Sequence, residues 1–415
     1  MALHCAKSFA NDILGSKAIP ITLHRTYAYA VRTKNSTAQR DKLLKLAQER
    51  GRDFDVVVNY DEMFTFIQRC VEKAGCVSSQ SRAVAEMLLY ADERGHFSHG
   101  VNRINIYTRD LIAGTTKGNG VPSVLKQKGA TAYVDGDNSL GPVVGRFCVE
   151  IGTELAKVNG IGIVAARNSN HYGAAGYYAN MAAEKGLIGM AFTNSSPCVY
   201  PTRSSEKALG SNPISFFAPA INGDGFNLDM ATSTVAYGKI EVADRKSKSE
   251  VPRGWGADAH GVETSDPSAI LGDGGLLPVG GAEERAGYKG TGLCMLVEIL
   301  CGVLSGAHFG KNVREWKGEP QKADLGQCYI FIDPECFADG FATRLQQFVD
   351  ETRDLIPVNP NLPVRVPGDF ARAHRQLVKE EGGLVYHGSQ IEYLKDVAEE
   401  LHVDLFKYRL FTNKH

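Results

Sequence analysis

Hydrophobic residues recur along the chain at two spacings, and the change between them predicts the order of its elements. From Asp61 to Ala74 and from Ser79 to Arg94 they return every three or four positions, which predicts two helices joined by a turn at 75–78. A third helix is predicted to begin near Ser98. The same spacing predicts further helices over 143–158, 174–184, 232–242, 290–304, 343–355, 370–381 and 389–402.

Strand-type apolar runs are concentrated in the middle of the chain. They cover 131–134, 160–166, 187–193, 214–218, 227–230 and 328–332. A strand-rich centre between helical flanks predicts an α/β protein of the α+β type, in which a sheet domain packs on a helical domain built from both ends of the chain. We expect an extension over 1–55, a helical domain over 56–128 with 290–405, and a central sheet domain over 129–289.

The composition is that of a soluble globular protein. The chain has 415 residues, of which 43% are hydrophobic and 22% charged, enough to bury a large core in two or more packed units. Its 46 basic and 47 acidic residues give a net charge of −1, so we expect neither a nucleic-acid nor a membrane partner. No apolar run approaches the roughly 18 to 20 residues of a membrane span.

The cysteines and the first segment of the chain bear on its compartment. Nine scattered cysteines without a Cys-x-x-Cys pair predict reduced thiols in an intracellular compartment. Cys198 lies in a loop and is a candidate catalytic thiol, although an inert cysteine is the simpler interpretation. Residues 1–52 hold ten Lys/Arg against three Asp/Glu, a bias typical of a mitochondrial presequence. An untargeted cytoplasmic extension, with an amphipathic helix over 38–50, is the alternative.

The segment 91–107 carries the strongest candidate chemistry. If a helix begins near Ser98, then His99, Arg103 and Tyr107 lie four residues apart on one stripe. An imidazole, a fixed cation and a phenol in one row are suited to hold a small carboxylate and move a proton beside it. Polar residues at this spacing are equally typical of a solvated helix face.

A second imidazole, His171, lies in a loop between a predicted strand and a predicted helix, where α/β proteins often expose chemistry. Catalysis and capping of the following helix are both open for it. His96 and His99 are spaced to share a metal ion. Two ligands without a third partner make a weak site, so we expect no metal.

Four polar turns together form the pattern that a ligand spanning several loops would require, and three of them stand at predicted helix starts. The four turns lie at 210–213, 229–233, 288–292 and 367–369. At two of these helix starts, 229–233 and 288–292, exposed N–H groups could receive a phosphate. Each of them is a weak signal singly, because N-capping is the ordinary role of a polar residue at a helix start and the turn at 210–213 only enters a strand. The run Gly160–Ala165 formally fits G-x-G-x-x-A, but its glycines open a strand and start no helix, so we reject a Rossmann fingerprint.

Seven segments in this order resemble the malate/L-lactate dehydrogenase family of NAD(P)-dependent oxidoreductases. This non-Rossmann group includes ureidoglycolate and sulfolactate dehydrogenases. The matching segments are 98–103 (Ser-His-Gly-Val-Asn-Arg), 168–173, 210–214, 229–233, 274–281, 288–292 and 367–369. The resemblance extends from about residue 58 to 400 and leaves out only the N-terminal extension. The family pattern differs at Ser211, where threonine is usual, at Asp369, where glutamate is commoner, and at 202–207, which lacks a glycine pair.

The resemblance implies a largely antiparallel sheet, a central domain that binds NAD or NADP, and a homodimer with the active site near the subunit contact. It places the substrate carboxylate on Arg103, with Ser98 and Tyr107 nearby, and acid–base work on His99 and His171. The residues that it assigns to the cofactor are Asn212, Asp229, Met230, Ala231, Thr232, Ser233, Tyr288, Lys289, Gly290, Gly368 and Asp369.

The expected reaction is hydride transfer between C4 of the nicotinamide and C2 of a 2-hydroxy or 2-keto acid. We expect His171 to carry the proton and His99 to orient the substrate. L-Malate is the first candidate, followed by L-lactate, other 2-hydroxy acids including sulfonated ones, and a cyclic imine. Two alternatives stay open: an inactive family member that acts as a binding protein, and a metal-dependent hydrolase that uses His96 and His99.

Overall fold

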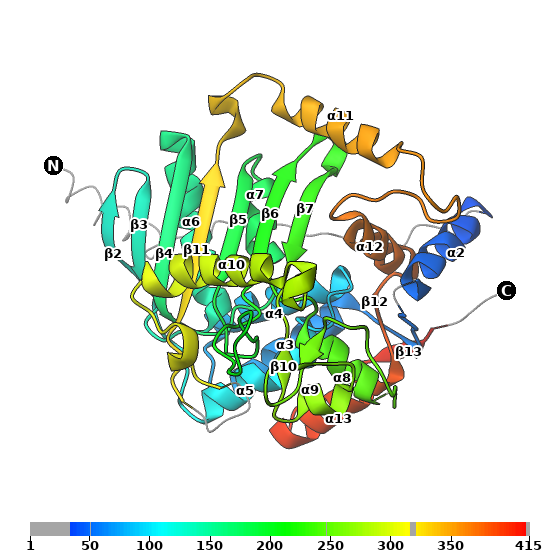
Figure 1. The fold of residues 1–415 in the computed structure, drawn as a ribbon, viewed down its shortest axis with the longest axis horizontal. Coiled ribbons are helices and arrows are strands. Elements are labelled where there is room, and N and C mark those ends of the chain that lie inside the picture. Colours follow the sequence, from blue (N-terminus) through cyan, green and yellow to red (C-terminus); the bar gives the residue numbers. More distant parts are fainter. Residues whose placement is uncertain (1–33, 50, 246, 316–320, 412–415) are drawn as a thin grey trace.

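The computed structural model describes residues 34–49, 51–245, 247–315 and 321–411. A seven-stranded sheet stands at its centre (Figure 1). In spatial order the strands are β2 (Ser123–Lys128), β3 (Thr131–Asp135), β4 (Ile161–Ser169), β11 (Leu325–Ile332), β5 (Ile188–Thr193), β6 (Ile214–Pro219) and β7 (Gly225–Met230). Only β3 and β4 pair in parallel among these described strands. The predicted α+β fold with a largely antiparallel sheet is confirmed, and the sheet is not of the Rossmann type.

Strand β11 shows how the sheet is covered on both faces. Side chains alternate along a strand, and Tyr329 and Phe331 join the large core under α6 (Gly141–Asn159) and α7 (Ala175–Ala183). Cys328 and Ile330, which alternate with them, belong to a smaller cluster under α10 (Gly287–Glu298) and its π-helical continuation (Ile299–Val303). The domain boundaries predicted from the sequence assign β11 to the helical part, whereas it lies in the middle of the sheet.

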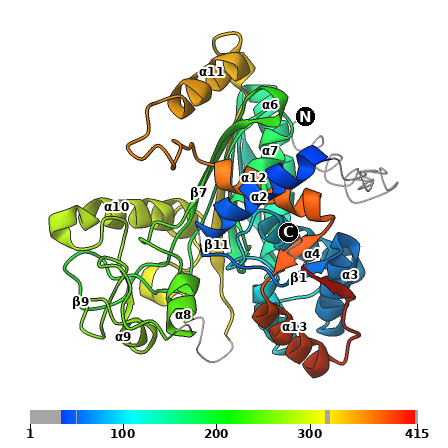
Figure 2. The same cartoon turned by 90° about the vertical axis from the view of Figure 1, so that its right-hand side faces the viewer.

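A helical region packs beside the α6 and α7 face of the sheet (Figure 2). It contains α3 (Tyr60–Lys73), α4 (Ser78–Glu93), α5 (Ile104–Ile112), α12 (Asp369–Glu381) and α13 (Gly388–Leu401). A small antiparallel sheet of β12 (Leu384–Tyr386), β1 (Val56–Val58) and β13 (Tyr408–Leu410) joins its two sequence halves. The helical domain built from both ends of the chain is therefore present.

The N-terminal extension predicted over 1–55 includes a helix that packs on the body. Helix α2 (Lys34–Gln48) lies against α12, and the buried Arg40 forms an ion pair with the buried Glu381. Leu43 and Ala47 are buried on the same side. The amphipathic helix expected there is confirmed. The presequence interpretation concerns residues 1–52, of which 1–33 and 50 lie outside the described residues, and it stays a prediction.

A small lobe projects from the opposite face of the sheet (Figure 2). It contains β8 (Gly256–Ala257), β9 (Glu263–Thr264), β10 (Gly275–Leu276), α8 (Tyr237–Arg245) and α9 (Pro267–Leu271), and it has its own apolar cluster. The helix predicted to begin at Thr232 begins instead at Tyr237. Thr232 and Thr234 donate their backbone N–H groups to Ser211 and Leu277 in other segments, which holds this stretch extended.

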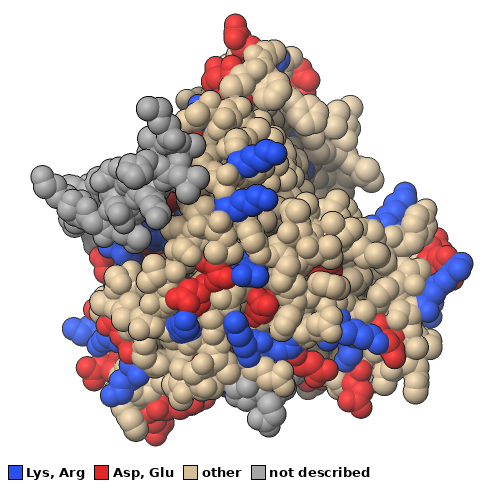
Figure 3. Space-filling model, turned by 90° about the vertical axis from the view of Figure 1, so that its left-hand side faces the viewer, with Lys and Arg blue, Asp and Glu red and all other residues tan. Residues whose placement is uncertain are grey.

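Four further features of the described chain bear on the predictions: the conformation at Gly160, the cysteines, the length of apolar helices and the surface charge. Gly160 ends α6 in a left-handed conformation and β4 follows, so the rejected Rossmann fingerprint is a helix end and a strand. The eight described cysteines are free thiols. Within the described ranges, no helix combines the length and apolarity of a membrane span. On the face drawn in Figure 3, acidic and basic side chains are interspersed.

Candidate active site

The turn that carries His99 is held by a buried carboxylate. Asp92, near the end of α4, accepts a hydrogen bond from the backbone N–H of Val101 at 3.0 Å and another from the hydroxyl of Tyr386 at 2.9 Å. The chain therefore bends through 96–100 before a short 3-10 turn (Val101–Arg103) leads into α5. The helix predicted to begin near Ser98 is wrong, because His99 precedes the first helical turn.

Arg103 and Tyr107 still lie one turn apart, at the start of α5. The Arg103 Nε donates to the carbonyl oxygen of Ser98 at 2.7 Å, which fixes the guanidinium beside the His99 turn. Ser98 Oγ in turn lies 3.0 Å from His99 Nδ1. The candidate substrate residues predicted at 98–107 therefore form one connected group, although not along a single helix face.

His171 approaches this group from a distant part of the chain, in the loop between β4 and α7. Its ring stacks on that of His99 with centroids 6.4 Å apart and planes inclined by 12°. The hydroxyl of the buried Tyr107 lies 2.8 Å from His171 Nδ1. The structure thus brings the two predicted imidazoles and the predicted guanidinium into one site.

Both imidazoles are held in the neutral form. Burial, followed by the charge of Arg103, lowers the pKa of His99 to about 4. Burial also lowers the pKa of His171 well below its ordinary value, with further contributions from His99, Arg103 and Arg314. A neutral imidazole is ready to accept a proton. A bound carboxylate would offset the charge of Arg103 and raise both pKa values again.

The Tyr107 hydroxyl suits an imidazole that must both give and take a proton. Burial raises the pKa of Tyr107, so the phenol keeps its proton. A hydroxyl group can donate to Nδ1 or accept from it. In the first arrangement His171 Nε2 carries a hydrogen, and in the second it is a base. Tyr107 therefore contacts His171, and its predicted direct contact with substrate stays a prediction.

Two of the predicted cofactor segments meet at the end of β7. Val279 N donates to the carbonyl oxygen of Thr232. A side chain at Gly290 would lie only 2.3 Å from the Val279 carbonyl oxygen, so glycine permits the first turn of α10 to approach this point. The exposed Lys289 stands beside it in the same turn.

The side chains of the Asp229–Ser233 segment have internal partners. Thr232 Oγ donates to Ser211 and Asn212 carbonyls, and Ser233 Oγ donates to Val235. Asp229 accepts from Gly176 N at 3.1 Å, and burial raises the Asp229 pKa to about 7. Since no helix begins at Thr232, the structure does not support the phosphate site expected at a helix start there. Of the Asp229–Ser233 segment, Met230 and Ala231, which are both partly buried, are the residues whose side chains make no hydrogen bond.

The side chain of Asn212 forms hydrogen bonds with three other residues of the protein. Its amide oxygen accepts from Ser195 N at 3.1 Å, and its amide nitrogen donates to Cys294 O and to Glu298 Oε1 at 2.9 Å. The side chain is fully buried. Its predicted role in cofactor binding stays a prediction, and the contacts in the structure are with the protein itself.

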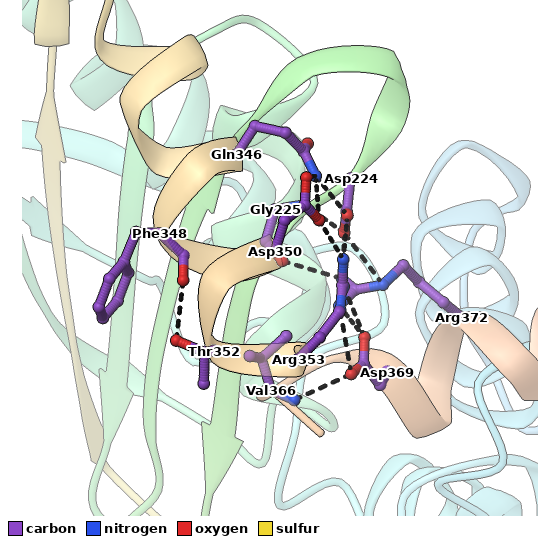
Figure 4. Close-up of polar contacts among 10 residues, drawn as sticks. All are labelled: Asp224, Gly225, Gln346, Phe348, Asp350, Thr352, Arg353, Val366, Asp369 and Arg372. Atoms are coloured by element: carbon purple, nitrogen blue, oxygen red, sulfur yellow. Dashed lines mark hydrogen bonds and ion pairs between the residues drawn. The ribbon is translucent and has the colours of Figure 1, made fainter. Parts of the chain in front are cut away.

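Asp369, which follows the N-cap residue Gly368 of α12, belongs to an ionic network that joins three segments (Figure 4). Arg353, the last residue of α11 (Phe341–Arg353), reaches Asp224 Oδ2 at 2.6 Å and Asp369 Oδ1 at 2.7 Å. Arg372 contacts the same Asp369 oxygen at 2.7 Å. The other oxygen of Asp369 accepts from Val366 N at 2.9 Å. The Asp369 carboxylate, expected as a simple cap facing a cofactor, is thus engaged by two arginines.

This network predicts an acid-sensitive contribution to stability. Burial alone would raise the pKa of Asp224, but hydrogen bonds from Arg353 and Gln346 hold it well below its usual value, and the pKa of Asp369 is lowered for related reasons. Carboxylates with a depressed pKa in the folded state stabilise it above their unfolded pKa of about 3.9, and lose that contribution as the pH falls.

We expect Arg353→Met to lower the free energy of unfolding by about 1–3 kcal/mol at neutral pH, because it removes one of the two arginines that neutralise the partly buried carboxylates of Asp224 and Asp369. Thermal unfolding followed by circular dichroism measures the change. Arg344→Met, at an exposed position of the same helix, is the control with a smaller effect. The difference between Arg353→Met and wild type should shrink below about pH 4; a difference that does not change with pH contradicts this account.

Two charged residues near the site carry no motif and were not predicted from the sequence. Glu241 of α8 places its carboxylate 3.8 Å from Arg103 Nη2. Arg314 forms a partly buried ion pair with Asp110 and contributes to the pKa shift of His171. Both lie far from the histidines in sequence, and no spacing pattern connects them. Among the described residues, no group of three or more potential metal ligands occurs.

Residues at the end of β7 and in the first turn of α10 are of types that could contact a dinucleotide. Partly buried Met230 and Ala231 offer apolar contact for a ring, and the exposed Lys289 offers a cation for a pyrophosphate. The Pro367 carbonyl accepts from Asn227 N, which brings the predicted 367–369 turn to the same strand. Candidate cofactor residues from three motifs therefore line one strand.

The chain is similar to known dehydrogenases in sequence and in structure. The family model described as malate/L-lactate dehydrogenase matches residues 58–395. A malate dehydrogenase of Pyrococcus abyssi is 40% identical over 299 residues, which cover 71% of this chain and 81% of the relative. An L-sulfolactate dehydrogenase of Methanocaldococcus jannaschii is 34% identical over 342 residues, 81% of this chain and 95% of the relative. The solved malate dehydrogenase of Pyrococcus horikoshii has a TM-score of 0.77 and 34% identity, covering 86% and 98% of the two chains.

Proposed function

The chain belongs to the malate/L-lactate dehydrogenase family, and from this premise we propose that it transfers a hydride between NAD or NADP and C2 of a small 2-hydroxy or 2-keto acid. The observation that carries the proposal is the meeting of Arg103, His99 and His171 from separate segments. A fixed guanidinium beside neutral imidazoles is a site that recognises a carboxylate and moves a proton next to it.

The nicotinamide, when bound, supplies or accepts the hydride. Arg103 holds the C1 carboxylate and so orients C2. During oxidation, His171 Nε2 takes the hydroxyl proton as the C2 hydride leaves; during reduction, the protonated imidazole returns a proton to the carbonyl oxygen. The Tyr107 hydroxyl follows the change at Nδ1. We assign orientation of the substrate to His99, whose Nδ1 lies 3.0 Å from Ser98 Oγ and whose ring stacks on that of His171.

L-Malate is the first substrate that we propose, because the malate dehydrogenases of two Pyrococcus species are 40% and 42% identical to this chain. A panel of oxaloacetate, pyruvate, sulfopyruvate and a cyclic imine carboxylate, each with NADH and with NADPH, tests the proposal by absorbance at the nicotinamide band. We expect turnover with at least one 2-keto acid. Binding of NADH without turnover of any compound would favour an inactive binding protein, and loss of activity on chelation would favour a metal enzyme.

We also propose that two copies of the chain associate through α10. Exposed apolar side chains recur along its outer face at Tyr288, Met295, Ile299 and Val303, each more than half exposed. A helix of a soluble protein rarely leaves such a stripe uncovered, and a self-complementary stripe suits a two-fold interface. Lys289 lies in this helix, so the contact would lie near the cofactor edge.

Ile299→Glu is expected to shift the protein from dimer to monomer at micromolar concentration, because a charge at the centre of the stripe must be desolvated on association. Light scattering after size-exclusion chromatography measures the mass. Val158→Glu, which replaces an isolated exposed valine at the end of α6, should leave the mass unchanged. A monomeric wild-type protein, or a dimer that Ile299→Glu does not disturb, rules out this interface.

A further inference from the structure

Arg103 has only one end of its guanidinium group available for a carboxylate. Its Nε already donates to the Ser98 carbonyl oxygen at 2.7 Å. A bidentate pair with an acid must therefore use the two terminal nitrogens, Nη1 and Nη2. The carboxylate of Glu241 lies 3.8 Å from Nη2, so the position that a substrate carboxylate needs has an acidic neighbour supplied by the protein.

Glu241 reaches this position because α8 lies directly on the site. A side chain at Gly238, in the first turn of α8, would lie 3.3 Å from Ser98 Cβ and 3.5 Å from Arg103 Nη2. The absence of a side chain there permits the helix to approach Arg103 closely. Helix α8 belongs to the small lobe, whose apolar cluster includes Ile240 and is separate from the core beneath Tyr107.

From these contacts we propose that Glu241 is a specificity-determining residue that competes with the substrate carboxylate for Arg103. In the ligand-free enzyme Glu241 neutralises the guanidinium, and an incoming acid must displace it. The side chains of Arg103 and Glu241 are 24% and 30% exposed, so water can solvate the carboxylate that is released. Compounds without an acidic group cannot displace Glu241, and the site therefore selects for acids. The redox part of this inference rests on the proposed function.

The test removes the charge of Glu241 and keeps its shape. Glu241→Gln should bind oxalate about three- to fivefold more tightly than wild type in a calorimetric titration, the range that corresponds to a partly exposed ion pair. It should lower the KM for the preferred 2-keto acid by a similar factor and leave the KM for the nicotinamide cofactor unchanged. Glu263→Gln is the matched control, because it removes another ion-paired carboxylate of the same lobe, bound to Arg285 at 2.6 Å, and should leave oxalate affinity unchanged.

A second pair of variants distinguishes competition for Arg103 from a general electrostatic repulsion between Glu241 and the bound acid. In the Arg103→Ala background, adding Glu241→Gln should no longer tighten oxalate binding, because the shared cation is gone. Equal oxalate affinity in wild type and Glu241→Gln, absence of binding in both, or the same tightening without Arg103 each overturn the inference. If oxalate behaves as expected and no 2-keto acid is reduced, the competition for Arg103 stands and the proposed dehydrogenase reaction fails.

Discussion

His171→Ala is expected to lower kcat for the preferred substrate by about 10²- to 10⁴-fold, the usual contribution of a positioned general acid or base. The substrate KM should change little, because Arg103 still holds the carboxylate. The expectation rests on the 2.8 Å contact between His171 Nδ1 and the Tyr107 hydroxyl, because of which we assign the proton exchange with the substrate to Nε2. Steady-state kinetics measured from about pH 5 to about pH 9, the interval in which histidines ordinarily titrate, gives the loss.

Two further histidine variants make this result specific. His99→Ala should have the smaller effect on kcat, since we assign orientation of the substrate to it. His260→Ala, at an exposed position of the small lobe, should have wild-type kinetics. If His171→Ala retains nearly full turnover while His99→Ala does not, the two roles are reversed and the proton passes through His99.

Arg103→Lys is expected to raise the KM for the acid by about 10- to 100-fold, because an ammonium group reproduces neither the fork nor the bond from Nε to Ser98. The dissociation constant of NADH, measured by fluorescence, should stay within about twofold of wild type, since the cofactor residues lie on other elements. Arg109→Lys, at an exposed position of the same helix, is the matched control. A loss of NADH affinity equal to the loss of substrate affinity would show that Arg103 supports the fold of the site.

Local periodicity predicted much of the fold. The helices at 60–73 and 78–93 and the strands at 161–169 and 188–193 lie close to their expected bounds, because one face of each is buried and the hydrophobic spacing records it. Where the sequence analysis was wrong, distant residues decide the conformation. The turn at 96–100 depends on the carboxylate of Asp92 and the hydroxyl of Tyr386, and the extended stretch before α8 depends on Ser211 and Leu277.

The candidate site likewise contains residues that the sequence predicts and residues that only the folded structure brings together. The sequence predicts His171 as a site residue because it follows a buried strand, and Arg103 because it lies four residues from His99. Glu241 sits in an ordinary polar helix, and only packing of the small lobe places it on Arg103. The engagement of Asp369 by Arg353 likewise joins residues whose proximity no sequence spacing records. Long-range ion pairs of this kind become visible only when the chain is folded.

Transfer of deuterium from the nicotinamide is the measurement that tests the central claim most directly. The enzyme is incubated with the preferred 2-keto acid and cofactor reduced with deuterium at C4, and the product is analysed by proton NMR. The account predicts deuterium at C2 of the 2-hydroxy acid and loss of this product in His171→Ala. Product that carries hydrogen at C2, or no 2-hydroxy acid from any 2-keto acid tested, would contradict it.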